Sequence, residues 1–341
     1  MKKKLVFSMM SLVMVASVSS AWAKGRLVVY CSNEPTVCQA VCDKFAEIND
    51  VKVQMTRSGS GSTYAKILAE KENPKGDVWY AGTLDPHSQA GVNGLLEIYK
   101  SPVLSEIGEK FKNPATSQKN HTAGVYAGVL GYSVNKDLLK EKKLAMPQSW
   151  DDLTKPEYKG LIQIASPQSS GTAYTTLATV VQIMGEEKAF DYLAKLHKNI
   201  GQYTKSGSAP GKAAARGETL IGIGFLHDHA KQIVNGFPLE LVVPAEGTGY
   251  EIGGLSIIKG ARNMENAKKM VDFLLSKEGQ EILATVKSFQ VPTNKNAAIP
   301  KEAIRLDQVK LIDYDFVKYG TEEMRAHLID RWAKEIKPLS R

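Results

Sequence analysis

The sequence predicts an α/β protein made of two α/β lobes, with a two-segment hinge and a ligand cleft between the lobes. Three observations support this prediction. Strand-like and helix-like patterns alternate in two separate blocks of the chain, which is typical of mostly parallel sheets with helices on both faces. Two long extended runs accompany the blocks. Each block also has its own Gly/Ser turn immediately before a helix.

The first block has the order β-α-β-α-β. Strands are expected at 26–32 (RLVVYCS), 51–58 and 77–82, because these runs are apolar and rich in β-formers. Helices are expected at 35–48 and 62–73.

The second block repeats this alternation. We expect a strand at 161–166, a helix from residue 172, and strands at 203–206 and 220–226. Residues 264–286 are expected to be helical.

The two extended runs, 124–135 (GVYAGVLGYSVN) and 250–259 (YEIGGLSIIK), are the expected hinge. One continuous sheet is the alternative, but separate Gly/Ser turns favour two lobes. The expected lobe boundaries are 24–125 plus 253–300 for lobe one, and 126–252 plus 301–341 for lobe two.

Length and composition exclude several protein classes. The chain has 341 residues, of which 43% are hydrophobic, and this rules out a disordered or collagen-like chain. Its 44 basic and 36 acidic residues are interleaved, with no basic stripe that would indicate nucleic-acid binding. The mild positive excess suits a small anionic ligand.

The N-terminus resembles a secretory signal peptide at residues 1–23. Lys2, Lys3 and Lys4 precede an apolar run, and Ala21-Trp22-Ala23 is an A-x-A cleavage site. We therefore expect export to the periplasm. No later segment is long and apolar enough to cross a membrane.

The three cysteines, Cys31, Cys38 and Cys42, lie close together in the sequence. In an oxidising compartment they predict one disulfide and one spare thiol. Cys38 and Cys42 are four residues apart on an expected helix, a poor geometry for a bridge, so we favour Cys31–Cys38. A zinc site is a weaker alternative, because no His is nearby at ligand spacing.

Gly/Ser loops supply candidate anion-binding groups. The loop 57–63 (RSGSGST), which contains Ser60 and Gly61, follows a strand and opens a helix. Glycines allow close backbone approach, and free N–H groups at a helix start attract anions. Such a turn can equally be a simple N-cap. The second block repeats the arrangement at 169–174 (SSGTAY), and Lys205 adds a cation in a third loop.

Polar residues expected at the end of a later strand suit a different part of a ligand. Asp228 and Glu251 can accept hydrogen bonds from sugar hydroxyls, and His227 can donate or accept. His227 with His229 could also be a metal pair, which ranks lower because His229 could begin the next helix. Trp79 and Tyr80 fit ring stacking and core packing about equally.

A catalytic function has little support. Neither a G-x-S-x-G nucleophile elbow nor an H-E-x-x-H zinc motif occurs. The chain offers hydrogen-bond donors without an activated nucleophile. A binding protein without cofactor or metal is therefore favoured over an enzyme.

The motifs at 27–32 (LVVYCS), 76–80 (GDVWY), 149–153 (SWDDL) and 156–160 (PEYKG) resemble the iron(III)-binding-protein branch of periplasmic ABC-transporter solute-binding proteins. The resemblance covers the whole chain after residue 23. It implies the periplasmic-binding-protein-like type II fold, whose two lobes close on a ligand, and an inner-membrane ABC permease as partner. We expect a monomer.

Within this branch, members that bind iron carry paired tyrosines where this chain has His227 and Asp228. Phenolates are strong ferric ligands, so their absence argues against iron. The segments 222–228 (GIGFLHD) and 246–254 (EGTGYEIGG) are similar to the hexose-phosphate-binding proteins. That similarity implies sugar contacts for His227, Asp228 and Glu251, and phosphate contacts at the 169–173 helix start.

The sequence thus predicts a sugar-phosphate-binding protein that delivers its ligand to the permease. A ferric-iron-binding protein is the first alternative, and a binder of another phosphorylated or phosphonate metabolite is the second. The full set of candidate ligand-binding residues is Ser32, Asn33, Ser60, Gly61, Thr83, Ser169, Ser170, Gly171, Thr172, Ala173, Lys205, His227, Asp228 and Glu251.

Overall fold

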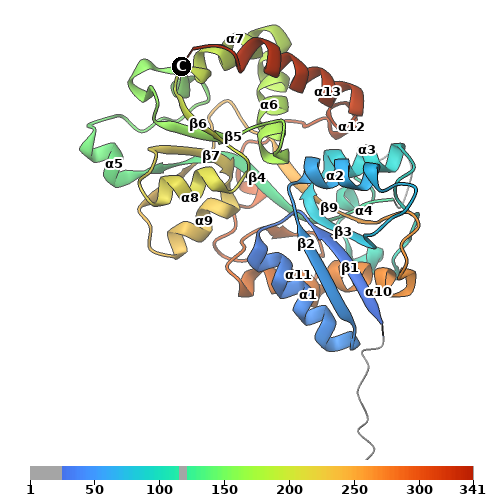
Figure 1. The fold of residues 1–341 in the computed structure, drawn as a ribbon. Helices are drawn as coiled ribbons and strands as arrows, with labels where there is room; N and C mark the ends of the chain where they lie inside the picture. Colours follow the sequence, from blue (N-terminus) through green and yellow to red (C-terminus); the bar gives the residue numbers. More distant parts are fainter. Residues whose placement is uncertain (1–24, 115–120, 341) are drawn as a thin grey trace, which may run out of the picture.

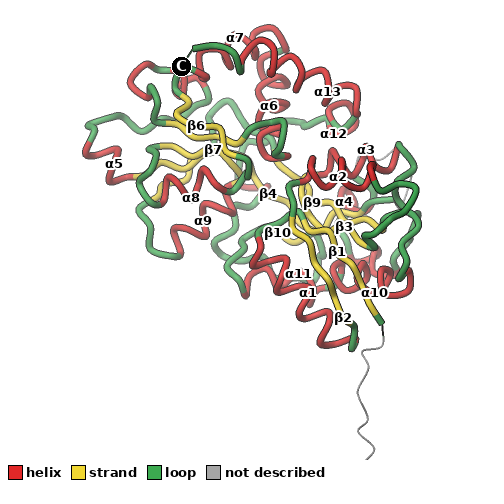
Figure 2. The backbone as a smooth tube through the Cα atoms, in the orientation of Figure 1, coloured by secondary structure: helices red, strands yellow, loops and turns green. Residues whose placement is uncertain are grey.

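The computed structural model describes residues 25–114 and 121–340, so the predicted signal segment lies outside the described residues. The described chain forms two lobes joined by strands β4 (Ala123–Asn135) and β9 (Tyr250–Ile257) (Figure 1). In both lobes helices lie on either side of the strands (Figure 2). None of the helices in these two described ranges combines the length and apolar character needed to cross a bilayer.

The remaining strands alternate with helices, as the sequence pattern indicates. They are β1 (Arg26–Cys31), β2 (Lys52–Arg57), β3 (Val78–Thr83), β5 (Ile162–Ala165), β6 (Ile200–Thr204), β7 (Ile221–Phe225), β8 (Leu239–Val242) and β10 (Val291–Pro292). The strand order is β2-β1-β3-β9-β4-β7-β5-β6, and β8 and β10 also pair with β4.

The helices connect and cover these strands. They are α1 (Pro35–Asn49), α2 (Ser60–Ala69), α3 (Leu84–Val92), α4 (Glu109–Lys112), α5 (Lys136–Glu141), α6 (Gly171–Met184), α7 (Glu186–His197), α8 (Ala209–Ala215), α9 (Leu226–Val234), α10 (Met264–Leu275), α11 (Lys277–Thr285), α12 (Phe316–Tyr319) and α13 (Glu322–Arg331). A π-helical turn, Trp332–Ile336, follows α13.

The sheet consists of two parallel parts joined by antiparallel strands. β1 is parallel to β2 and β3, and β5 is parallel to β6 and β7. β4 is antiparallel to β9 between Ala123 and Val129, and to β7 between Leu130 and Val134. The backbone pairing is therefore continuous through β4, although the chain forms two lobes.

Side-chain packing separates the two lobes. One core includes Leu27 and Phe45 and ends on β4 at Ala127. The other begins on β4 at Leu130 and includes Trp332 beyond α13. The chain thus passes between the cores a third time, between β10 and α12. The predicted lobe boundaries stay a prediction.

Several expected elements differ in the structure. The strand expected at 203–206 is β6 at Ile200–Thr204, and the helix expected at 62–73 is α2 at Ser60–Ala69. The helical stretch 264–286 is divided at Ser276, whose extended backbone ends α10 and whose hydroxyl accepts a hydrogen bond from the Gly279 N–H at 3.1 Å, capping α11. His227 and Asp228 were expected at the end of a strand, but β7 ends at Phe225 and both residues lie in the first turn of α9. A strand and a helix that meet without a turn residue give no local signal of their boundary.

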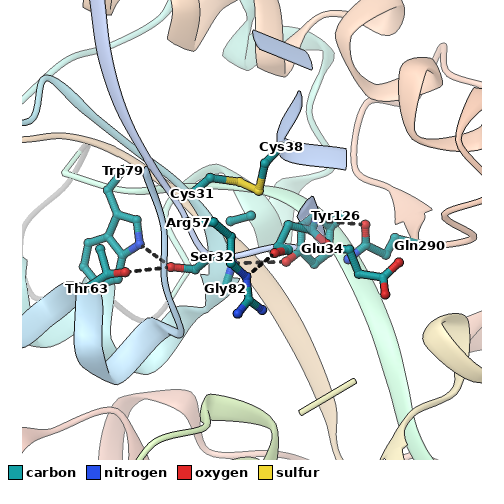
Figure 3. The surroundings of a disulfide bond; sticks show 12 residues. Cys31, Ser32, Glu34, Cys38, Arg57, Thr63, Trp79, Gly82, Tyr126 and Gln290 are labelled. Carbon is teal, nitrogen blue, oxygen red and sulfur yellow. Dashed lines mark hydrogen bonds between the residues drawn. A yellow bond between two sulfur atoms is a disulfide. The ribbon is translucent and has the colours of Figure 1, made fainter. Parts of the chain in front are cut away.

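A disulfide joins the end of β1 to the first turn of α1 (Figure 3). It links Cys31 and Cys38, whose Cα atoms are 6.0 Å apart. Cys42 is a buried free thiol, and burial raises its pKa to about 12. Because the thiolate is the reactive form, Cys42 is inert at neutral pH.

Replacing both Cys31 and Cys38 with Ala should lower the free energy of unfolding by about 2–3 kcal/mol, because closure of a short loop restricts the unfolded chain. Denaturant titration with and without reducing agent measures this loss. Reduction should destabilise the wild type and leave the double variant unchanged. Equal stability of oxidised wild type and variant would contradict the expectation.

Candidate ligand-binding site

A polar cavity of about 300 Å³ lies between the two lobes. Both lobes contribute to its wall, along with residues of the crossing strands. The lining residues are Ser32, Asn33, Glu34, Arg57, Ser58, Gly59, Ser60, Ser62, Gly82, Thr83, Tyr126, Ser169, Ser170, Gly171, Thr172, Lys205, Ser206, Gly207, Ser208, Phe225, His227, Asp228, Glu251 and Gln290.

The fold directs six helix starts toward this cavity. In lobe one, the segments that enter α1, α2 and α3 from β1, β2 and β3 line it, and in lobe two the segments that enter α6, α8 and α9 do so. Helix N-termini carry partial positive charge and unpaired N–H groups. Their convergence makes the cavity suitable for an anionic group.

The starts of α2, α3 and α6 meet across the cavity. Ser60 Oγ accepts a hydrogen bond from the Thr83 N–H at 3.2 Å, which ties α2 to the end of β3. Ser170 Oγ accepts from the Ala173 N–H at 3.4 Å and caps α6. A Cβ on Gly171 would collide with Thr83 of the opposite lobe, and one on Gly59 would lie 2.9 Å from the Ser169 carbonyl. The lobes are therefore in contact here.

Two cations belong to the cavity wall. Arg57 Nε donates to the Asn33 carbonyl at 2.9 Å, which fixes the base of the guanidinium group. Lys205 lies in the loop before α8 and is exposed. Both cations can pair with a ligand anion.

An acidic cluster, defined as His227, Asp228 and Glu251, lies on α9 and β9. His227 Nε2 is 3.7 Å from Asp228 Oδ1 and 3.6 Å from Glu251 Oε1, and the side chains of His227 and Glu251 are each 5% exposed. Burial raises the pKa of Asp228 to about 7, and the Glu34 charge acts in the same direction. Burial, with the charge of Asp228, raises the pKa of Glu251 well above its usual range.

The His227 ring is fixed on several sides. It stacks on Phe225 at 5.8 Å between ring centroids, and the Gln290 amide donates to its Nε2 at 3.3 Å. Gly128 of β4 leaves room for the ring, since a Cβ there would collide with Nδ1. Burial lowers the pKa of His227 to about 3, so the ring is neutral at physiological pH. Because Nε2 accepts the hydrogen bond from Gln290, the single proton of the neutral ring is on Nδ1.

Of the candidate residues predicted from the sequence, all line the cavity except Gly61 and Ala173, the second residue of α2 and the third residue of α6. The Ser32 hydroxyl is already engaged, accepting from the Trp79 indole N–H and contacting Thr63 Oγ1, each at 3.1 Å (Figure 3). Trp79 is fully buried and stacks on His87, so of the two alternatives it packs in the core and does not stack on a ligand ring.

The idea of a metal pair at His227 and His229 has no support in the structure. His229 is fully buried against Gly211 and Gly224 and does not line the cavity. Within the described parts of the chain, no group of three or more His, Cys, Asp or Glu side chains is arranged to hold a metal ion.

Sequence reasoning missed several cavity residues. Glu34 follows the predicted Asn33, and Arg57 begins the predicted Gly/Ser loop 57–63, yet neither was among the candidate ligand-binding residues. Their charge could have identified them. Tyr126 and Gln290 come from β4 and from the segment before β10, far from any helix start. Tyr126 accepts a hydrogen bond from the Gly82 N–H at 3.1 Å (Figure 3). Only the three-dimensional fold brings these two residues to the site.

A cavity that lies between two α/β lobes and carries polar groups from both is typical of proteins that enclose a small solute. Residues 78–319 match the family described as bacterial extracellular solute-binding protein. The chain belongs to that family.

Individual relatives agree with this assignment. The periplasmic binding protein AfuA from Actinobacillus pleuropneumoniae, solved with exogenous fructose-6-phosphate bound, is 56% identical, with a TM-score of 0.91 over 93% of this chain and 100% of that one. An uncharacterized protein of Haemophilus influenzae is 53% identical over 93% of this chain and 92% of its own length. The predicted periplasmic-binding-protein fold is thereby confirmed.

A more distant relative belongs to the iron-binding branch. The major ferric iron-binding protein of Neisseria meningitidis is 26% identical over 83% of this chain and 86% of its own length. The resemblance to the iron(III)-binding-protein branch is confirmed at the level of family.

Gly171→Ala should weaken binding of a small solute in the cavity at least tenfold, because the added methyl group collides with Thr83 and keeps the lobes apart. Gly61→Ala is the matched control, since its Cβ would meet only the end of Arg325 at 3.4 Å. Calorimetric titration of both variants measures the effect. Similar affinities for the two variants would show that this close contact between lobes is not required.

The acidic cluster predicts a pH-dependent stability. The pKa of Asp228 is about 7 in the folded protein and about 3.9 in the unfolded chain. Its contribution to stability is therefore complete below pH 4 and is lost as the pH rises through 7. Asp228→Asn cannot titrate. The unfolding free energy of ligand-free wild type, minus that of the variant, should fall by about 2 kcal/mol between pH 5 and 8. A difference that stays constant or rises would contradict the raised pKa.

Proposed function

We propose that the protein is the periplasmic solute-binding component of an ABC importer, that it binds a sugar phosphate of the hexose phosphate class, and that it delivers this ligand to an inner-membrane permease. The observation that carries the proposal is the division of one cavity into two chemical regions. The starts of α2 and α6, with the two cations, form one region, and the acidic cluster at the start of α9 and on β9 forms the other.

The two regions determine how the ligand would lie. A phosphate is favoured at the starts of α6 and α2, where N–H groups and the Ser170 and Thr172 side chains lie. Two carboxyl groups beside the phosphate would repel it, so the polyol end faces Asp228 and Glu251. The fructose-6-phosphate bound to AfuA, at 56% identity, supports this ligand class.

Ferric iron is less well supported as a ligand. Tyr126 is the tyrosine among the cavity residues, and its hydroxyl accepts a hydrogen bond from Gly82. Burial, with the charge of Glu251, raises the pKa of Tyr126 well above its usual range, which opposes the phenolate that ferric iron prefers. A phosphorylated or phosphonate metabolite other than a hexose phosphate would use the same helix starts.

We expect fructose 6-phosphate to bind at least a hundredfold more tightly than fructose. Each charge-assisted hydrogen bond to phosphate contributes about 1.5–3 kcal/mol, so loss of two such bonds exceeds a hundredfold change in affinity. Calorimetry on ligand-free protein tests this. Equal affinity for the sugar and its phosphate would reject the proposal, and so would a ferric charge-transfer band that is lost in Tyr126→Phe.

Two variants separate the regions. Asp228→Ala should weaken fructose 6-phosphate binding at least tenfold and leave inorganic phosphate binding unchanged or slightly stronger, because the hydroxyl acceptors and a repulsive charge are both removed. Thr172→Ala should weaken the binding of both fructose 6-phosphate and inorganic phosphate. Full hexose-phosphate affinity in the Asp228 variant would place the polyol end elsewhere.

A further inference from the structure

A buried carboxylate of lobe one forms ion pairs with two lysines of lobe two. Glu34 precedes α1, is 5% exposed and lines the cavity. Its Oε1 lies 2.6 Å from Lys212 Nζ on α8, and its Oε2 lies 2.8 Å from Lys231 Nζ on α9. Each carboxylate oxygen thus has its own ammonium partner. Figure 3 shows Glu34 in the surroundings of the disulfide.

The position of Glu34 at the helix start makes this reach possible. Glu34 has extended backbone at the N-cap of α1, yet its side chain does not cap the helix. Its own N–H donates to Asn33 Oδ1 at 2.7 Å. The carboxylate is therefore free to extend away from α1, and the backbone that carries it is held in place.

The two lysines belong to the other lobe and do not line the cavity. α8 packs on β7, and α9 packs on β4 and β8. The Lys212 side chain is 37% exposed and that of Lys231 is 14% exposed, so both can be hydrated if the lobes part. Lys231 also donates to Thr36 Oγ1 at 3.2 Å, a second contact with α1.

Electrostatics agree with an ion pair that needs both lobes. Burial alone would raise the pKa of Glu34, but the ion pairs with Lys212 and Lys231 lower it below its usual value. In the closed arrangement the two ion pairs therefore outweigh the cost of burying the carboxylate, since the net effect on the pKa of Glu34 is a lowering. Separation of the lobes would remove both partners together, so the contact favours the closed arrangement.

We propose that Glu34, Lys212 and Lys231 form an electrostatic latch between the lobes that slows release of a bound ligand. The latch rests on the proposed function only for the identity of the ligand. Glu34 is a positioning residue in this scheme, because it acts through the closed state. Contacts made after the lobes close act on dissociation far more than on association.

The test compares rates for fructose 6-phosphate by stopped-flow. Glu34→Gln should raise the dissociation rate at least tenfold and change the association rate less than threefold. Lys231→Met, combined with Lys212→Met, should reproduce this effect although neither lysine lines the cavity. Adding Glu34→Gln to the double lysine variant should raise the rate little further, because the three residues act as one unit.

The matched control is Glu218→Gln, which removes a carboxylate paired with Arg216 at 2.6 Å on the exposed surface of lobe two. It should leave both rates unchanged. If Glu34→Gln alone speeds dissociation and the lysine variants do not, Glu34 acts by touching the ligand and the latch is rejected. Unchanged dissociation in all variants also rejects it.

The latch can also be tested if the proposed ligand is wrong. If wild type does not bind fructose 6-phosphate, small-angle scattering of ligand-free proteins decides the matter. Glu34→Gln and the double lysine variant should both have a larger radius of gyration than wild type and the Glu218 variant. Equal radii in all four proteins would overturn the latch.

Discussion

The arrangement of the molecule depends on the hydrogen bonding of strand β4. This strand pairs with β9 and β10 in one lobe and with β7 and β8 in the other, and each of its residues is buried. It therefore belongs to both sheets, while the side chains on either side pack into separate cores. The hydrogen-bonded backbone of the sheet runs through both lobes, but the hydrophobic core does not. A change in the angle between the lobes would therefore bend the crossing strands and disrupt either core little.

The same strand organises the site. Gly128 of β4 leaves space for the His227 ring, and Tyr126 of β4 bonds to Gly82 at the end of β3. Glu251 extends from β9, whose register pairs it with Gly128. The acidic cluster thus combines Glu251 of a crossing strand with His227 and Asp228 of α9, whereas the helix starts of α2 and α6 belong to one lobe each. A ligand that reaches both regions would contact both lobes and the crossing strands.

The sequence was sufficient for whatever depends on local patterns. Alternating apolar runs located β1, β2, β3 and the crossing strands, and the Gly/Ser turns located Ser60 and the Ser169–Thr172 segment. Glycines and hydroxyl side chains shape the backbone at a helix start. The residues that mark such a turn in the sequence are therefore the same residues that line the cavity. Gln290 and Tyr126 have no such signal, because they reach the cavity only through long-range pairing of β10 with β4. The boundary between β7 and α9 was missed since no turn residue separates Phe225 from Leu226.

The presence of three carboxyl groups around a cavity suited to an anion has a physical explanation in their surroundings. Glu34 is ionised, but Lys212 and Lys231 neutralise it. Asp228 and Glu251 have raised pKa values because they are buried near each other, so they carry less negative charge at neutral pH than two isolated carboxylates would. The field at the helix starts therefore remains favourable for a phosphate, and the acids retain the oxygen atoms that hydroxyl groups require. Glu34 links the acids to the contact between the lobes. Its charge raises the pKa of Asp228, and the same carboxylate pairs with the two lysines of the opposite lobe.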